Sequence, residues 1–213
     1  MRLELGKRAR CSDGAERELV DLVLDASSRR VTHLVVQPEG DPGDARLVPV
    51  ELASAGADEH EISLRCTEQQ LEEMSLVHES AYVGTGEQVE EEEDGWEVGV
   101  RDMQVIPDYL PTAAPGDLAP EVVVTYDRVP KGEIELRHAS DIYSADRHHL
   151  GSVEGVVVDP DGRISQLLLG RGHLWWRREI SIPAEAVAEL TNDMVTLGVS
   201  KSELGTFPSE RRS

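Results

Sequence analysis

A short run of aromatic and cationic residues, Trp175-Trp176-Arg177-Arg178, is the segment of this sequence best suited to bind another molecule. It holds two of the chain's three tryptophans beside two arginines. These two residue types are enriched at the energetic centres of protein interfaces. The sequence therefore predicts a protein-binding surface here. Two alternatives stay open: the run packs against another part of the chain or a second copy of it, or it forms a base-stacking platform for RNA.

Other residues with chemical potential fit structural roles better. His138, His148, His149 and His173 all lie in the C-terminal part of the chain, but no cysteine accompanies them. A zinc site needs three or four converging ligands, and adjacent residues of a strand point to opposite faces. We therefore expect no metal site.

Two glycine-containing motifs are also predicted to be turns. Asp159-Pro160-Asp161-Gly162 begins like a calcium loop, but the twelfth position, where such a loop needs a glutamate, is Gly170. The run Gly170-Arg171-Gly172 lacks the third glycine and the following helix of a dinucleotide site. Neither cysteine, Cys11 or Cys66, has the surroundings of a nucleophile. The sequence thus predicts no catalytic residue and no cofactor.

The overall composition limits the classes of partner. The 213 residues carry 42 acidic and 21 basic side chains, a formal charge of -21. Nucleic-acid binding depends on Lys and Arg that neutralise phosphates, so we expect no nucleic-acid partner. No apolar run reaches about 18 residues, and the N-terminus lacks the pattern of a signal peptide. Two cysteines suit free thiols in a reducing compartment. We expect a cytoplasmic protein without a membrane span.

The charge concentrates in the middle of the chain. Residues 78–128 hold 13 acidic and 2 basic side chains, with Glu90, Glu91, Glu92, Glu93 and Asp94 in one run. Four prolines follow between residues 107 and 120. Like charges repel, and proline disfavours helix interiors and central strands. We predict an extended linker at about 84–120, either a solvated spacer or a docking segment for a basic partner.

The regions on either side of this segment repeat each other. Residues 19–25 and 31–36 resemble 153–159 and 164–169, and the distance from Asp25 to Pro49 equals that from Asp159 to Pro183. Thr67–Leu71 and Ser200–Leu204 both open with a capping-box pattern. The offset stays at 133 to 134, which indicates an internal duplication.

Each repeat consists mainly of short runs rich in β-branched residues, separated by turn signals. Several short strands in about 75 residues favour a small β-barrel. We predict a mainly β chain with short helices: a first barrel at 1–80, an acidic linker at 81–129, a second barrel at 130–208 and a tail at 209–213.

The second repeat resembles a known family. The phrase Ile142–Val153, the turn 158–162 and the continuation Gly172–Pro183 are similar to the PRC-barrel domain, named after the cytoplasmic part of the photosynthetic reaction-centre H subunit and also found at the C-terminus of a ribosome-maturation factor. The first repeat is similar through Gly6, Arg8 and Asp13-Gly14. The resemblance covers about 150 residues and implies a barrel that binds other proteins without catalysis.

The combined expectation is a non-catalytic cytoplasmic adaptor or scaffold that binds a partner protein through its barrels. Three alternatives accompany it. The first is an assembly factor that binds a basic ribosomal protein, the second is a structural homo-oligomer in which the Trp-Arg run is self-complementary, and the third is a sensor that binds a metal or another ligand.

Overall fold

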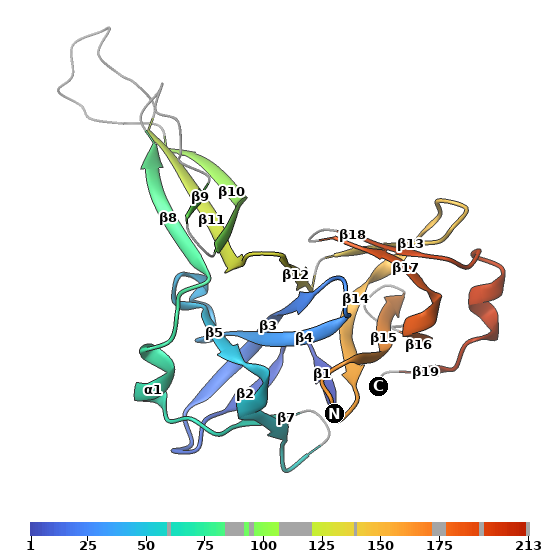
Figure 1. The fold of residues 1–213 in the computed structure, drawn as a ribbon, viewed down its shortest axis with the longest axis horizontal. Coiled ribbons are helices and arrows are strands. Elements are labelled where there is room, and N and C mark those ends of the chain that lie inside the picture. The colour runs from blue at the N-terminus through green and yellow to red at the C-terminus, as the bar shows by residue number, and fades with distance from the viewer. Residues whose placement is uncertain are drawn as a thin grey trace, which may run out of the picture.

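The computed structural model describes residues 1–58, 61–83, 92–93, 96–106, 121–138, 140–171, 178–191 and 194–211. Strands dominate these residues, and they form three sheets (Figure 1). Two of the sheets are large and curled, which gives the chain a barrel-like character. The predicted mainly β class is therefore confirmed.

The first large sheet belongs mostly to the N-terminal half. The N-terminal part of the chain contains β1 (Arg2–Glu4), β2 (Lys7–Arg10), β3 (Glu16–Asp25), β4 (Arg30–Gln37), β5 (Arg46–Pro49), β6 (Ala53–Ala55), β7 (Glu61–Leu64) and helix α1 (Glu68–Glu72). Two 3-10 turns, η1 (Pro42–Asp44) and η2 (Val50–Leu52), flank β5.

The second large sheet belongs mostly to the C-terminal half. The C-terminal part of the chain contains β12 (Glu133–Arg137), β13 (Asp141–Tyr143), β14 (His149–Val158), β15 (Ile164–Arg171), β16 (Arg178–Pro183), β17 (Val187–Leu190), β18 (Met194–Leu197) and β19 (Ser209–Arg211). The 3-10 turns η3 (Ala184–Ala186) and η4 (Glu203–Thr206) follow β16 and precede β19.

The two sheets have the same internal order. The first runs β5-β4-β3-β2-β7-β6, and the second runs β16-β15-β14-β13-β18-β17. In each sheet one neighbouring pair is parallel, β2 with β7 and β13 with β18, and the other pairs along this path are antiparallel. Corresponding strands in the two halves thus occupy corresponding places.

Each half also donates one strand to the other half. Strand β1 pairs with β14, and β12 pairs with β3, both antiparallel. Leu3 lies opposite Val156, and Leu136 lies opposite Leu22. Leu3 and Leu136 are 133 positions apart in the chain, and Leu22 and Val156 are 134 apart, so the two pairings join equivalent residues and have equivalent registers. The exchange is reciprocal.

The exchanged strands build one shared hydrophobic core. Leu3 and Leu136 are both fully buried, and they belong to a single cluster that also contains residues from β3, β4, β14 and β15. Burying a leucine side chain stabilises a fold by about 2–3 kcal/mol. Each large sheet therefore includes one strand from the other predicted unit: β12, from the unit at 130–208, pairs with β3, and β1, from the unit at 1–80, pairs with β14. Residues 209–211, predicted to be a tail, form strand β19.

The third sheet corrects the linker prediction. It has the order β8-β11-β10-β9 and comprises β8 (His78–Val83), β9 (Glu92–Glu93), β10 (Trp96–Ile106) and β11 (Glu121–Pro130). Residues 96–106, inside the segment predicted as an extended linker, thus form a long strand. The prediction was based on the charge and the prolines of this part of the chain, although Val98, Val100 and Val105 of β10 are typical of a strand. Residues 84–91, 94–95 and 107–120 lie outside the described residues.

The third sheet projects away from the two large sheets (Figure 1), and its base packs against the N-terminal sheet. A second, smaller cluster of buried side chains joins Val129 of β11 to Val23 and Val35 of the N-terminal sheet, with Val77 and the partly buried Trp96 beside them. The N-terminal sheet therefore has apolar side chains on both faces: one face contributes to the shared core, and the other supports the third sheet.

The predicted capping box at Thr67 is confirmed. The hydroxyl of Thr67 accepts a hydrogen bond from the Gln70 amide at 3.3 Å, and the Gln70 side chain accepts one from the Thr67 amide at 3.0 Å. In the second half Glu203 likewise accepts from the Ser200 amide at 2.8 Å, but the helical turn begins only at Glu203 and is 3-10.

Candidate functional site

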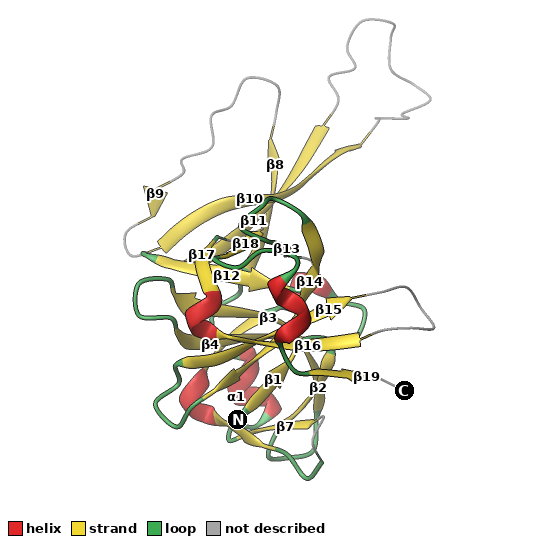
Figure 2. Cartoon of the chain, turned by 90° about the vertical axis from the view of Figure 1, so that its right-hand side faces the viewer, coloured by secondary structure: helices red, strands yellow, loops and turns green. Residues whose placement is uncertain are grey.

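The candidate site lies at one end of the C-terminal sheet, where β15, β16 and β19 are consecutive strands (Figure 2). Two arginines stand opposite each other there: Arg171 at the end of β15 pairs with Arg178 at the start of β16. Arg178 also pairs with Arg211 of β19. Like charges directly opposite each other in a sheet are destabilising, so the pairing of Arg171 with Arg178 is unfavourable for folding alone.

Strand alternation fixes the face on which Arg171 and Arg178 lie. Side chains two positions apart in a strand share a face. Arg178 therefore shares its face with Ile180, which is buried, and Arg171 shares its face with Leu169, which is also buried. This is the face that contributes to the shared core, and both arginines lie at its exposed end.

A cleft of about 330 Å³ opens at this place. Its apolar lining comes from Ile180, from Leu204 of η4, and from the partly buried Phe207, which packs on the shared core. The polar lining comes from Arg171 and Arg178, with Ser209 of β19 beside them. We call these lining residues the arginine cleft. It combines an apolar floor with a cationic rim, and its size suits one or two side chains of a partner.

The two rim arginines form no ion pair with any carboxylate whose side chain the structure describes, and both arginine side chains are exposed. This contrasts with the total charge of -21. A pair of unneutralised guanidinium groups in a strongly acidic protein is a place where an external carboxylate gains charge-assisted hydrogen bonds.

The corresponding region of the N-terminal half is closed by its own residues. Arg46 of β5 occupies the place of Ile180, and its Nε donates to Asp44 at 2.8 Å. Its Nη1 donates to the carbonyl of Met74 at 3.0 Å. The cation on that side is therefore satisfied within the chain, so the two ends differ in what they offer to a partner.

The structure places one of the four predicted binding residues in this cleft. Arg178 begins β16 and lines the cleft. Trp175, Trp176 and Arg177 lie outside the described residues. The sequence reasoning missed Arg171, Ile180, Leu204 and Phe207. Arg171 could have been found by aligning the two strands around the hairpin, because its register opposite Arg178 follows from that pairing.

The remaining motifs of the sequence have local structural roles. The turn at Asp159–Gly162 joins β14 to β15, and the Asp159 carboxylate accepts hydrogen bonds from the amides of Asp161 and Arg163, both at 2.9 Å. This confirms the predicted hairpin turn.

Two of the histidines have separate acidic neighbours. His148 Nδ1 lies 3.1 Å from Asp146, and His149 Nε2 lies 2.9 Å from Asp141. Both histidines are exposed. In the part of the chain that the structure covers, no group of three or more His, Cys, Asp or Glu side chains is arranged to hold a metal ion. His173 lies outside that part.

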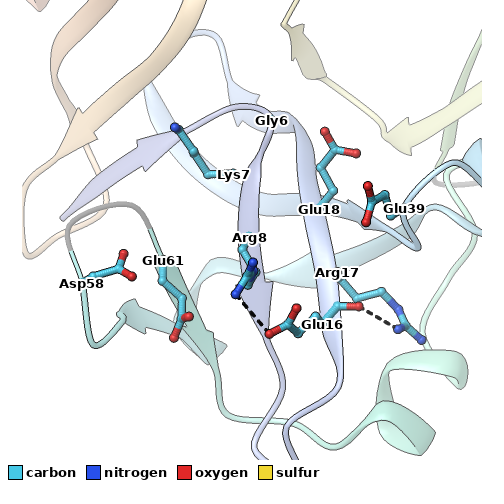
Figure 3. Close-up of a pocket in the computed structure, with 9 residues that line it drawn as sticks. All are labelled: Gly6, Lys7, Arg8, Glu16, Arg17, Glu18, Glu39, Asp58 and Glu61. Atoms are coloured by element: carbon cyan, nitrogen blue, oxygen red, sulfur yellow. Dashed lines mark hydrogen bonds and ion pairs between the residues drawn. The ribbon is translucent and has the colours of Figure 1, made fainter. Parts of the chain in front are cut away.

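Two other hollows have different linings. One of about 440 Å³ lies over β2 and β3, and its wall is charged (Figure 3). Arg8 is held there by Glu16 at 3.2 Å, and Arg17 reaches out of it to Glu68 at 2.6 Å, so these cations are already neutralised. A wider one of about 730 Å³ lies between β4, β12 and the turn after β14.

The wider hollow contains a small hydrogen-bonded group. The hydroxyl of Thr32 lies 2.6 Å from the carboxylate of Glu133 and 3.1 Å from Nδ1 of His33. The same hydroxyl also lies 3.1 Å from the backbone carbonyl of Val23, to which it is a donor. The group joins β4 to the exchanged strand β12, so we assign it to the attachment of that strand.

No helix among the described residues has both the length and the apolar character needed to cross a membrane. Neither the scan against protein-family models nor the search of curated proteins finds a match to this chain.

Proposed function

We propose that the protein is a non-catalytic cytoplasmic adaptor that binds a partner protein through its C-terminal half, at the arginine cleft. The observation that carries this proposal is the pair of exposed, unneutralised arginines, Arg171 and Arg178, beside the apolar side chains of Ile180 and Phe207. Such a combination of arginine and buried apolar surface is typical of the energetic centre of a protein interface.

The chemistry of the cleft favours binding over catalysis. A guanidinium group keeps its proton at every physiological pH and cannot serve as a general acid or base. It presents several N–H donors in one plane, which match a carboxylate. The cleft thus has the means to hold an acidic group and an apolar side chain together.

The proposal includes two PRC-type barrels that arose by duplication. Its support is the sequence resemblance, together with the equal strand order of the two large sheets and their equivalent pairings 133 or 134 positions apart. We include Trp175, Trp176 and Arg177 in the proposed surface because they directly precede Arg178 in the chain.

A charge-reversal capture experiment tests the function. The full chain, the double variant Arg171→Glu/Arg178→Glu, and the control Arg163→Glu are used as bait in native lysate, with quantitative mass spectrometry as the readout. Arg163 is exposed and lies outside the cleft. We expect a protein that is retained by the chain and the control and is reduced at least about tenfold with the double variant.

The other outcomes decide between the alternatives. Equal recovery of every protein with all three baits contradicts the proposal. Basic ribosomal proteins that bind all three baits equally would support the assembly-factor alternative, in which the acidic surface is the binding element. Recovery of the chain alone, with an apparent mass that rises with concentration in sizing experiments, would support the homo-oligomer.

A further inference from the structure

Strand β19 is the outer strand at the β16 end of the C-terminal sheet. Among the described residues it pairs only with β16, and no strand lies on its other side. An outer strand leaves a row of backbone N–H and C=O groups available for another chain. Extended peptides use such edges to add a strand, in which the backbone gives affinity and alternate side chains give specificity.

The register of the sheet determines which residues an added strand would meet. One cross-strand row consists of Arg171, Arg178 and Arg211. The row two positions away consists of Leu169, Ile180 and Ser209. A strand placed beside β19 would extend both rows by one residue each.

The two rows demand opposite chemistry from the added strand. In the arginine row, Arg171 and Arg178 form no ion pair with a carboxylate whose side chain is described, so this row favours Asp or Glu. The second row leads over the apolar floor of the cleft, formed by Ile180, Leu204 and Phe207, and favours an aliphatic residue. Because residues two apart share a face of a strand, both requirements can be met by one short segment.

We propose that the occupant of the arginine cleft is an acidic, extended segment of a partner protein that pairs with the edge of β19. It carries an acidic residue in line with Arg178 and an aliphatic residue two positions away in line with Ile180. This inference rests on the proposed adaptor function and adds to it the partner's chemistry and its mode of binding.

A designed peptide tests the proposal directly. The probe is a fluorescent peptide Thr-Val-Thr-Glu-Thr-Val-Thr, whose palindromic order offers Glu and Val two residues apart in either strand direction. Fluorescence anisotropy with the full chain should show saturable binding that weakens with added salt. Arg178→Glu should weaken it at least about tenfold, the scale of one lost charge-assisted hydrogen bond, and Arg163→Glu should not.

Three further probes separate pairing along the edge from simple charge attraction. A Thr-Thr-Val-Glu-Val-Thr-Thr peptide has the same composition but places Glu and Val on opposite faces, and a second control carries N-methyl groups on alternate backbone nitrogens. Both should bind at least about tenfold more weakly if strand addition is correct. Phe207→Ala should weaken the Val-containing probe and leave a Thr-for-Val probe unchanged.

The outcomes distinguish this inference from the function on which it rests. Equal binding of the original and the reordered peptides would overturn strand addition, even if the captured partner still depends on Arg178. No binding of the original peptide would also overturn it. Binding of the peptide without any captured partner that depends on the two arginines would instead count against the adaptor function and leave the edge site standing.

Discussion

The two junctions at which the halves exchange strands have the same register, but they differ in the residues at equivalent positions. At the first junction β1 lies on β14, and at the second β12 lies on β3. Glu4 of β1 faces Gly155, whereas Arg137, its counterpart in β12, faces Asp21. A residue without a side chain and an aspartate thus occupy equivalent positions.

Close approach explains the glycine. Gly155 has φ +152°, and a Cβ atom there would lie 2.1 Å from the carbonyl oxygen of Leu3. At the second junction the side chain contributes to the attachment instead: the Asp21 carboxylate accepts a hydrogen bond from the His138 amide at 3.2 Å. The topology therefore does not require one particular residue at this position, but each junction depends on the residue that it has there.

The charges on the exchanged strands are also reversed. In β1 the order is Arg2 then Glu4, and their contact measures 2.5 Å. In β12 the order is Glu135 then Arg137, with a contact of 3.1 Å. Glu4 and Glu135 are both buried, and a buried carboxylate has to be paired to be tolerated. Both junctions meet this need by placing the arginine two positions away on the same strand.

The largest effect is expected from Gly155→Ala. The new methyl group would collide with the backbone of β1 and displace the strand from β14, at a cost of about 3 kcal/mol or more in the free energy of unfolding. Urea denaturation followed by circular dichroism measures it. The control is Gly205→Ala, where a Cβ would meet nothing within 4 Å. Equal stability of the two variants would show that β1 does not pack against Gly155 as described.

A somewhat smaller effect is expected from truncating the exchanged leucines. Leu3→Ala and Leu136→Ala each remove a fully buried side chain and should each cost about 2–5 kcal/mol. Because both side chains belong to one core, each variant should unfold in a single transition. Differential scanning calorimetry checks this, with the exposed Leu76→Ala as the control. Two separate transitions would indicate that the halves are independent after all.

The smallest effect concerns a cysteine that has a serine as its counterpart. Burial raises the pKa of the Cys11 thiol to about 11, and the equivalent position in the second half is Ser144, also buried. Because the folded pKa lies above the unfolded value of about 9, the thiol contributes stability below pH 9, and this is lost as the pH rises towards 11. The loss should be on the order of 1–2 kcal/mol.

The measurement compares the chain with Cys11→Ser at pH 8 and pH 10.5. Both proteins also carry Cys66→Ser, because the Cys66 thiol interacts with Cys11 and its pKa depends on that contact, so the difference in their free energies of unfolding isolates the Cys11 thiol. A difference that stays constant between the two pH values would contradict the assignment. We expect the free energy of unfolding of the protein with Cys11, relative to that of the protein with Cys11→Ser, to be lower at pH 10.5 than at pH 8.

Local features of the fold could be predicted from the sequence, and long-range ones could not. The turn after Asp159 and the cap at Thr67 depend on residues within a few positions of each other, and both are found as predicted. Strand β1 has only three residues, and its partner lies more than 150 positions away. No local pattern in so short a segment indicates such a partner, so the exchange was missed.

The candidate site shows the same division. The composition of the run that ends in Arg178 led to a predicted binding surface, and Arg178 lines the cleft. Leu204 and Phe207, however, enter the cleft from a turn some 25 residues further on. Their role depends on the position of that turn beside the end of β16. The residues of the turn itself do not indicate this long-range contact.

The reciprocal exchange has a consequence for the order in which a growing chain can fold. The N-terminal sheet is complete only after β12 has been synthesised, and β1 finds its partner only after β14 has been synthesised. Until then Leu3 and Leu22 lack the neighbours that cover them in the finished protein. Folding dominated by such distant pairings is slow, and a nascent chain in this condition exposes apolar strands. On the ribosome, the first half must therefore wait for the second.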